Sequence, residues 1–195
     1  LITAECNDAP HAPWWHHDPD WWKAAEFLAN PGAEVISHYL TFGNRPGELE
    51  GLLVRAVDHL QHADLEMHEL LCFLRLAENR KLDAAWRDRL ASPVFREARK
   101  LVKVAPAQWE EYCLMPVSVV DSPDSLLAGF FGPALDESID WLIGQQKEDG
   151  RWAPAWSWGG EYPDTWADVE KEISAALTLQ TLIKLDRFHR LPRAL

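Results

Sequence analysis

Apolar residues recur every three to four positions along most of the chain, which is the spacing of one buried face of an α-helix. The clearest run extends from Leu49 to Leu60, with apolar side chains at i, i+3, i+4, i+7, i+8 and i+11. A similar spacing follows Asn30-Pro31, a pair expected to cap and begin a helix. It recurs from Met67 to Ala77 and, after a break expected at Ser92-Pro93, from Phe95 to Val102. The pattern therefore predicts helices in these four stretches.

The second half of the chain is less regular. A long irregular region is expected from Pro106 to about Pro133. Helical spacing resumes at Leu135 and stops at Asp149-Gly150, a strong turn pair. A last helix is predicted from about Trp166 to Phe188, and its expected inward positions are Ile173, Ala176, Leu177, Gln180 and Leu185.

A β-sheet is not expected, because only Val117–Val120 alternates between β-branched and polar residues. The predicted fold class is therefore all-α, with consecutive antiparallel helix pairs near residues 30–62, 65–104 and 132–188. A chain of 195 residues is long enough for one hydrophobic core, so residues 1–195 are taken as a single domain. A stack of helical hairpins is the expected arrangement.

Charge and cysteine usage narrow the classes of partner and location. The 19 basic and 31 acidic residues give a formal net charge of -12, which argues against binding to nucleic-acid phosphates. The three cysteines are odd in number and contain no C-x-x-C pair, which favours a reducing compartment and predicts a cytoplasmic protein. No stretch has the roughly 18 consecutive apolar residues expected of a membrane-spanning helix.

One short segment carries a resemblance to a known family. It contains Trp141-Leu142, Gln146 and Gly150-Arg151-Trp152. The spacing is similar to the QW motif of the squalene-hopene and oxidosqualene cyclases, whose relatives include the β subunits of protein prenyltransferases. Leu135 to Asp140 lack the basic and small residues with which that motif usually begins. Locally, Gly150 is expected to adopt a conformation that other residues resist, and Trp152 to cover the end of the preceding helix.

The resemblance implies a partial α/α toroid, built from helical hairpins, and a terpenoid-cyclase-like or prenyltransferase-like protein that binds an apolar, isoprenoid-type ligand. Such a ring needs about a dozen helices, whereas six or seven are predicted. The rest of the ring is expected either before Leu1 or from a second copy of the chain. The segment from Pro116 to Trp158 also resembles uncharacterised bacterial proteins that are called prenyltransferase-like. A fold of this kind does not by itself specify a reaction.

The acidic motifs of that family are absent. The chain has neither the D-x-D-D that protonates a polyene in triterpene cyclases nor the D-D-x-x-D that binds diphosphate through metal ions. Asp121 and Asp124 form a D-x-x-D, which makes them candidate catalytic carboxylates. Pro123 lies between them, so capping of a turn is the competing interpretation.

A second set of candidate residues lies on the helix predicted from Met67. Asp64, His68 and Cys72 fall on one helical stripe, but they extend too far along the axis to share one metal ion. His68 and Glu69 are candidate catalytic residues of a pocket there. The competing interpretation is a partly buried, structural histidine that is hydrogen-bonded to Asp64 or Glu66. A histidine group at residues 11–17 matches no defined metal site, so neither a metal nor a cofactor is expected.

Tryptophan is strongly over-represented, with 11 residues, and the clusters fall in stretches rich in Pro, Gly and Asp. Four of these residues are candidates for ligand binding, because indole rings can line an apolar cavity, stabilise a cation or stack on a sugar: Trp152, Trp156, Trp158 and Trp166. The competing interpretation is that they close the end of a helical barrel.

Three functions are consistent with these patterns. The first is an isoprenoid-binding protein of the cyclase type, active or inactive. The second is a carbohydrate-active α/α barrel with paired carboxylates across a tryptophan-lined groove. Its candidate acids are Asp121, Asp124, Glu69 and Glu161. The third is a helical-repeat binding protein without catalysis.

Overall fold

The computed structural model describes residues 3–20, 27–43 and 47–191, and the described residues form helices and loops without a β-strand. The α-helices are α1 (Ala29–Thr41), α2 (Leu49–His62), α3 (Met67–Ala77), α4 (Ala84–Leu101), α5 (Pro116–Val119), α6 (Pro133–Gly144) and α7 (Pro163–Arg187). Three short 3-10 helices are η1 (Ala4–Asp8), η2 (Pro13–Trp15) and η3 (Pro106–Gln108). The predicted all-α class is confirmed. No helix in the described part of the chain has the length and apolar character needed to cross a membrane.

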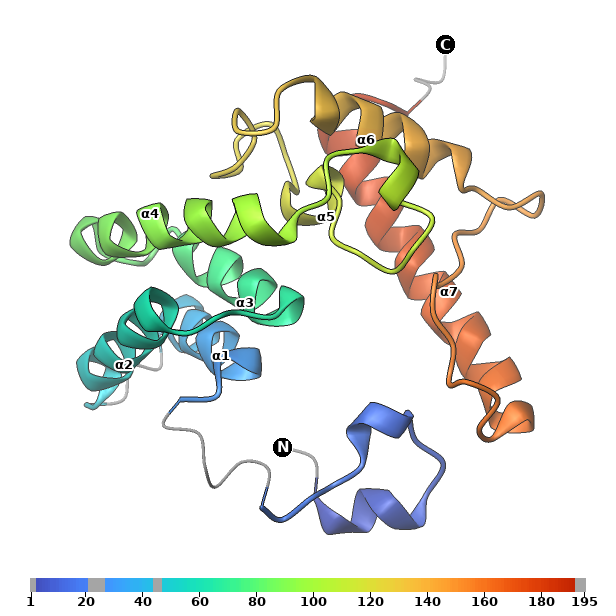
Figure 1. Ribbon diagram of the computed structural model, residues 1–195, viewed down its shortest axis with the longest axis horizontal. Helices are drawn as coiled ribbons and strands as arrows, with labels where there is room; N and C mark the ends of the chain where they lie inside the picture. Colours follow the sequence, from blue (N-terminus) through green and yellow to red (C-terminus); the bar gives the residue numbers. More distant parts are fainter. Residues whose placement is uncertain (1–2, 21–26, 44–46, 192–195) are drawn as a thin grey trace.

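The first four helices form two hairpins that stack on one another (Figure 1). α1 and α2 are antiparallel, since Phe27, which precedes α1, contacts His59 near the end of α2. α1 runs parallel to α3, because Glu34 pairs with Arg75 and Thr41 with Asn79, 41 and 38 positions further along the chain. Each hairpin therefore repeats the direction of the one before it, as in helical-repeat proteins.

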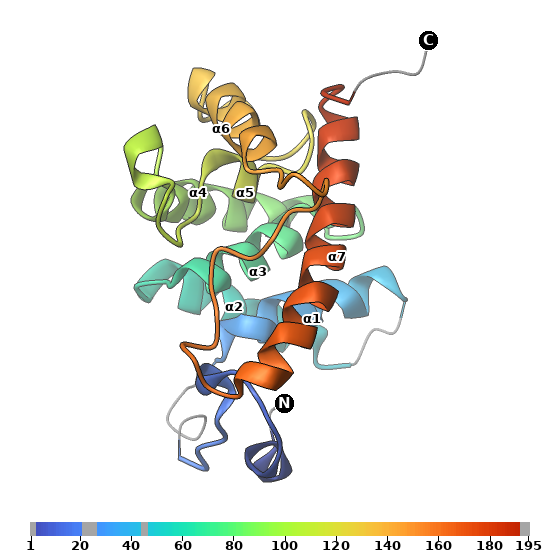
Figure 2. The same ribbon diagram turned by 90° about the vertical axis from the view of Figure 1, so that its right-hand side faces the viewer.

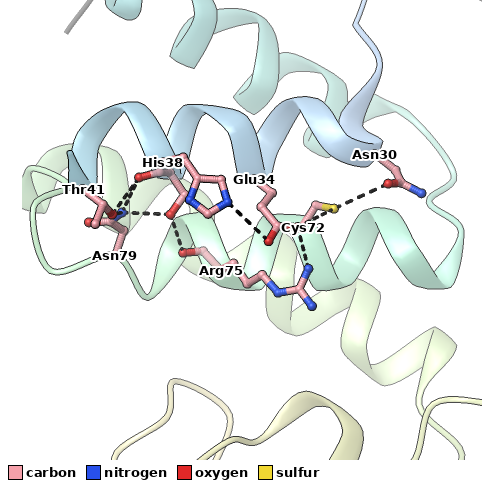
Figure 3. A network of polar contacts seen from close by, with 8 residues as sticks. Asn30, Glu34, His38, Thr41, Cys72, Arg75 and Asn79 are labelled. Carbon is pink, nitrogen blue, oxygen red and sulfur yellow. Dashed lines mark hydrogen bonds and ion pairs between the residues drawn. The ribbon is translucent and has the colours of Figure 1, made fainter. Parts of the chain in front are cut away.

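A polar seam joins α1 to the second half of α3 and the residues just after it (Figure 3). Its central contact is an ion pair between Arg75 and Glu34, with 2.6 Å between Nη1 and Oε2. At the far end, Asn79 Nδ2 lies within 2.9 Å of three acceptors, the Ser37 carbonyl, the Ser37 hydroxyl and the Thr41 hydroxyl. Because each contact needs a particular rotation of both helices, the seam sets how α1 and α3 face one another.

Beneath this seam lies the apolar core of the hairpin stack. Leu53, Ala56, Val57 and Leu60 are buried, as the spacing along α2 predicts. The expected break at Ser92-Pro93 is wrong, because α4 continues through Pro93. Pro93 lacks an N–H and costs helix stability, but it is buried with Leu90 and Val94, and this packing outweighs the local preference.

Two charged residues of α4 close the end of α2. Arg96 donates from Nη2 to the carbonyl of Leu60 at 2.7 Å, which satisfies a helix-end acceptor. Its neighbour Glu97 is only 1% exposed and accepts hydrogen bonds from Arg96 at 2.6 Å and Lys100 at 3.1 Å. Burial alone would raise the pKa of Glu97, but these two hydrogen bonds hold it below its usual value. The buried carboxylate is thus fully paired.

The second half of the chain lies against one side of this stack, and α7 crosses it as a long separate helix (Figures 1 and 2). The predicted inward face of α7 is partly wrong. Leu185 is buried as expected, but Ala176 and Gln180 are exposed, whereas Ser174 and Thr181 are buried. The contact face carries hydroxyl groups that bond to neighbouring segments. A search for apolar spacing alone therefore cannot find it.

Candidate functional site

A cleft with a volume of about 470 Å³ lies between α3, α5 and α7, and we call it the α3–α7 cleft. It is open to solvent on one side. Its apolar walls come from both halves of the chain, and they consist of Leu71, Leu74, Met115, Val117, Val119, Leu142, Leu177 and Ile183. The cleft is within the range of about 300–1,000 Å³ that is usual for small-molecule sites.

Three ionisable side chains, those of Lys184, Asp121 and Glu78, lie on the wall of the α3–α7 cleft. Lys184 donates to the Val117 carbonyl at 2.5 Å and pairs with Asp121 at 2.9 Å. Glu78, which follows the last residue of α3, accepts a hydrogen bond from the Leu126 N–H at 2.8 Å. Burial raises the pKa of Glu78, and the charge of Asp121 raises it further, against the hydrogen bond from Leu126. Glu78 thus keeps its proton to a higher pH than an ordinary carboxyl group does.

Two arginines add positive charge to the walls of the α3–α7 cleft. Arg75 is committed to Glu34 in the polar seam. Arg187, one turn beyond Lys184 on α7, has no ion-pair partner within the described residues. An acidic group that entered the cleft would therefore find one uncommitted guanidinium there.

The D-x-x-D pair predicted as catalytic is divided by the structure. Asp121 lines the α3–α7 cleft, where its carboxylate is held by Lys184. Asp124 is exposed and does not line this cleft. The two lie in a turn in which the backbone N–H groups of Asp121 and Ser122 both donate to the Ser125 hydroxyl at 3.1 Å. The turn thus presents only Asp121 to the cleft.

His68 and Glu69 occupy the first turn of α3, and they face different partners. Oε1 of Glu69 lies 3.3 Å from Nε2 of His59 on α2. His68 is half-exposed and contacts Glu66 and Tyr112 instead. The two residues therefore do not form one pocket. Both partners of His68, Glu66 and Tyr112, line a second cleft beside the loop from Lys103 to Leu114, although His68 itself does not line it.

The stripe of Asp64, His68 and Cys72 does not converge on one point. Asp64 is fully exposed, whereas Cys72 is buried against α1, with Sγ 3.8 Å from Glu34 Oε2. Burial and the Glu34 carboxylate raise the pKa of Cys72 to about 11, so the thiol stays protonated. Among residues 3–20, 27–43 and 47–191, no three His, Cys, Asp or Glu side chains are grouped as metal ligands.

The four candidate tryptophans form two separate structures. Trp156, Trp158 and Trp166 pack together, with ring centroids 5.4 Å apart between Trp166 and each of the other two. Trp14 of η2 packs edge-on against Trp156 at 5.5 Å, so this aromatic cluster fastens the N-terminal segment to the loop before α7. None of these rings lines the α3–α7 cleft.

Trp152, the fourth, closes the end of α6. Its indole N–H donates to the Leu142 carbonyl at 2.7 Å, and its backbone N–H donates to Thr178 of α7 at 2.9 Å. Gly150 adopts φ +85°, and Gln146 donates to the Gly150 carbonyl at 2.8 Å. The predicted turn and the covering indole are confirmed. Gln146 braces the turn and does not bond to the helix end.

An indole that bonds to the last carbonyls of a helix can end a helix in any fold. The arrangement of Trp152, Gly150 and Gln146 is therefore a local structure and does not identify a family. Comparison with protein-family models, with curated proteins and with solved structures found no significant match to this chain.

Several residues of these sites could not be found from the sequence. Glu78, Lys184 and Arg187 line one cleft only because the tertiary arrangement brings part of α7 near the end of α3, and no local pattern predicts that arrangement. Tyr112 lies in the region expected to be irregular, 44 positions from His68. The only available signal was negative: Gln180 and Lys184 interrupt the apolar face expected for the last helix.

Proposed function

We propose that this protein binds an amphiphilic, isoprenoid-type ligand in the α3–α7 cleft, with an apolar chain along the leucine and valine walls and an acidic head group at Arg187. In this proposal the stacked hairpins are part of an α/α toroid of the cyclase and prenyltransferase type. The parallel repeat of α1–α2 by α3–α4 supports the toroid, because such rings are built by repeating helical hairpins.

The observation that carries the proposal is the composition of the walls of the cleft. Eight apolar side chains from α3, α5, α6, α7 and the segments beside them face one space, together with an arginine that has no ion-pair partner among the described residues. Burying a hydrocarbon chain against such walls is favourable by about 25 cal/mol per Å² of apolar surface. The guanidinium can form two parallel hydrogen bonds to a phosphate or a carboxylate.

Binding is favoured over cyclisation of the ligand. Carbocation chemistry needs a site from which water is excluded, whereas this cleft is open on one side. Burial raises the pKa of Glu78, but the hydrogen bond from the Leu126 N–H opposes this effect and favours the ionised carboxylate, which is a poor proton donor. The proposal thus combines two of the functions expected from the sequence. The protein is a binding protein built from helical repeats, and its ligand is the apolar, isoprenoid-type molecule expected for a cyclase-like protein.

The apolar part of the proposal is tested with two leucines of α7. Leu177 lines the cleft, whereas Leu179, on the same helix, is 60% exposed and does not. Binding of farnesyl phosphate to the full chain is measured by titration calorimetry. Leu177→Gln should weaken binding about tenfold, since it places a polar group where the chain lies. Leu179→Gln should leave the affinity unchanged, and equal effects of the two substitutions would contradict the site.

The head group is tested with farnesyl phosphate, farnesoic acid and farnesol. Both acids should bind more tightly than the alcohol, by about tenfold for one charge-assisted contact of roughly 1.5 kcal/mol. Arg187→Gln should abolish this preference, and Arg55→Gln on the exposed face of α2 should not. If none of the three ligands binds, or if farnesol binds as well as the acids, the proposal is wrong.

A further inference from the structure

Three side chains form a hydrogen-bonded chain beside the second cleft. His68 Nδ1 lies 2.7 Å from Glu66 Oε2, and His68 Nε2 lies 3.0 Å from the Tyr112 hydroxyl. A carboxylate can only accept a hydrogen bond, so Nδ1 carries the proton. In the neutral imidazole Nε2 is then the acceptor, and the Tyr112 hydroxyl donates to it. The order of donors and acceptors is that of an acid, a base and a nucleophile.

The acid of this chain is held in place by the start of α3. Glu66 is the N-cap, and its other oxygen accepts from the Glu69 N–H at 2.8 Å. Glu69 returns a bond to the Glu66 N–H at 3.1 Å, which completes a capping box. The Glu69 N–H therefore helps to orient the carboxylate that orients His68, and the second bond of the box fixes the backbone of Glu66. Hydrogen bonds from His68 and Glu69 outweigh burial and lower the pKa of Glu66, so it stays ionised.

The loop that carries Tyr112 is tied down at its base. The Lys103 N–H donates to the Leu114 carbonyl at 2.8 Å, and the indole N–H of Trp109 donates to the Lys103 carbonyl at 2.8 Å. Trp109 is almost fully buried. The loop is thus a fixed support for the tyrosine, which is what a positioned nucleophile requires.

Tyr112 also lines a cleft of about 560 Å³ between the start of α3, the end of α4 and this loop. Lys100 and Lys103 line the same cleft. Lys100 is shared with Glu97 and Asp64, whereas Lys103 is exposed and forms no ion pair within the described part of the chain. A reacting group beside Tyr112 would therefore lie near an uncommitted ammonium.

We propose that Tyr112 is an acyl-accepting nucleophile, with His68 as its general base and Glu66 as the residue that orients His68. The substrate class is an activated acyl compound, an ester or a thioester. The Tyr112 oxygen attacks the acyl carbon, a C–O bond forms and the bond to the leaving group breaks. His68 takes the phenolic proton during the attack and returns it to the leaving group, so the products are acyl-tyrosine and an alcohol or thiol.

The protonation states of the neighbouring groups agree with this assignment. Burial and the Glu66 charge raise the pKa of Tyr112, so the phenol is neutral until His68 removes its proton in the reaction. Burial likewise raises the pKa of Cys113, whose thiol donates to the Gln108 carbonyl at 3.4 Å. The Cys113 thiol is hydrogen-bonded to a backbone carbonyl, whereas the Tyr112 hydroxyl is hydrogen-bonded to an imidazole, so the geometry favours Tyr112 over Cys113 as the activated nucleophile.

The test is acetylation of the full chain by p-nitrophenyl acetate, with the modified residues located by peptide mass spectrometry. Tyr112 should be acetylated at least about tenfold faster than Tyr162, which is also exposed but whose hydroxyl has no hydrogen-bonded base among the described residues, because general base catalysis contributes about 10²-fold or more. His68→Asn should lower the rate at Tyr112 to that of Tyr162. Glu66→Gln should give a smaller loss.

The matched control is His62→Asn. His62 also pairs with a carboxylate, Asp58 at 3.2 Å, but within the described part of the chain it has no hydrogen bond or ring contact with a tyrosine, so this variant should keep the original rate at Tyr112. Tyr112→Phe should remove the fast site and leave farnesyl phosphate binding unaltered, since Tyr112 does not line the α3–α7 cleft. Equal rates at Tyr112 and Tyr162, no response to His68→Asn, or acetylation of Lys100 or Lys103 in place of Tyr112 would each overturn the proposal.

Discussion

Glu78 shows how a single position can depend on contacts made far along the chain. In sequence it is an ordinary acidic residue near the end of a helix, where a negative charge is unfavourable. In the structure it is half-buried, bonded to the Leu126 N–H and close to the charge of Asp121. Its behaviour is therefore set by residues more than forty positions away.

The raised pKa of Glu78 predicts the direction in which the free energy of unfolding changes with pH. The folded chain holds this proton more tightly than the unfolded chain, so Glu78 stabilises the fold fully below the ordinary carboxyl pKa of about 4.3. That contribution is lost as the pH rises through the folded pKa. Relative to Glu78→Gln, the wild type should therefore be more stable at pH 4 than at pH 7, as measured by urea unfolding at both pH values.

The control for this prediction is Glu137→Gln on α6. Glu137 is exposed, and its carboxylate has no hydrogen bond or ion pair among the described residues, so the difference between this variant and the wild type should not change with pH. A Glu78→Gln variant whose unfolding free energy tracks that of the wild type at both pH values would show that the carboxyl is not desolvated.

Helices were predictable where their apolar faces pack on one core, and less so elsewhere. The face of α2 is buried as its spacing predicts. Pro93 was misleading because packing around it outweighs its local effect. α7 was only partly predictable, because its contact face contains Ser174, Thr178 and Thr181. Hydroxyl groups that bond between elements leave no hydrophobic period to detect.

The Trp152 contact links α6 and α7, and its strength can be measured. Trp152→Phe keeps most of the ring but removes the donor to the Leu142 carbonyl, so it should cost about 1 kcal/mol of unfolding free energy. Trp152→Ala also empties the space and should cost about 3–5 kcal/mol. Thermal and urea unfolding provide both values.

Trp166→Phe is the comparison for Trp152→Phe. Its ring packs in the aromatic cluster, and its indole N–H donates no hydrogen bond within the described residues, so a smaller loss is expected. If the two Phe variants were equally destabilised, the indole hydrogen bond of Trp152 would contribute nothing.

Charge is distributed unevenly over the whole molecule. The chain carries a net charge of -12, yet the α3–α7 cleft is lined by three basic residues, Arg75, Lys184 and Arg187, and two acidic ones, Glu78 and Asp121. Composition argued against nucleic acid as a partner, but it could not reveal that Arg187 would have no ion-pair partner among the described residues. The cleft itself could not be predicted from the sequence either, because only the tertiary arrangement brings together the elements that form it.

The N-terminal segment is attached to the rest of the molecule through rings. Trp14 packs on Trp156, whereas Trp15 is 51% exposed and has no ring partner in the described part of the chain. Trp14→Ala should therefore increase the rate of proteolytic cleavage within residues 3–20, and Trp15→Ala should not. Limited chymotrypsin digestion followed by mass analysis measures both rates, and equal rates for the two variants would contradict the attachment.

The parallel stacking of the two hairpins bears on the order in which the chain acquires its structure. Contacts between α1 and α3 join residues about 40 positions apart, whereas Lys184 reaches back 67 positions to Val117. Closing the shorter loops costs less chain entropy. We therefore expect the hairpin stack to form early and to exchange its amide protons most slowly, and α7 to dock last and open first.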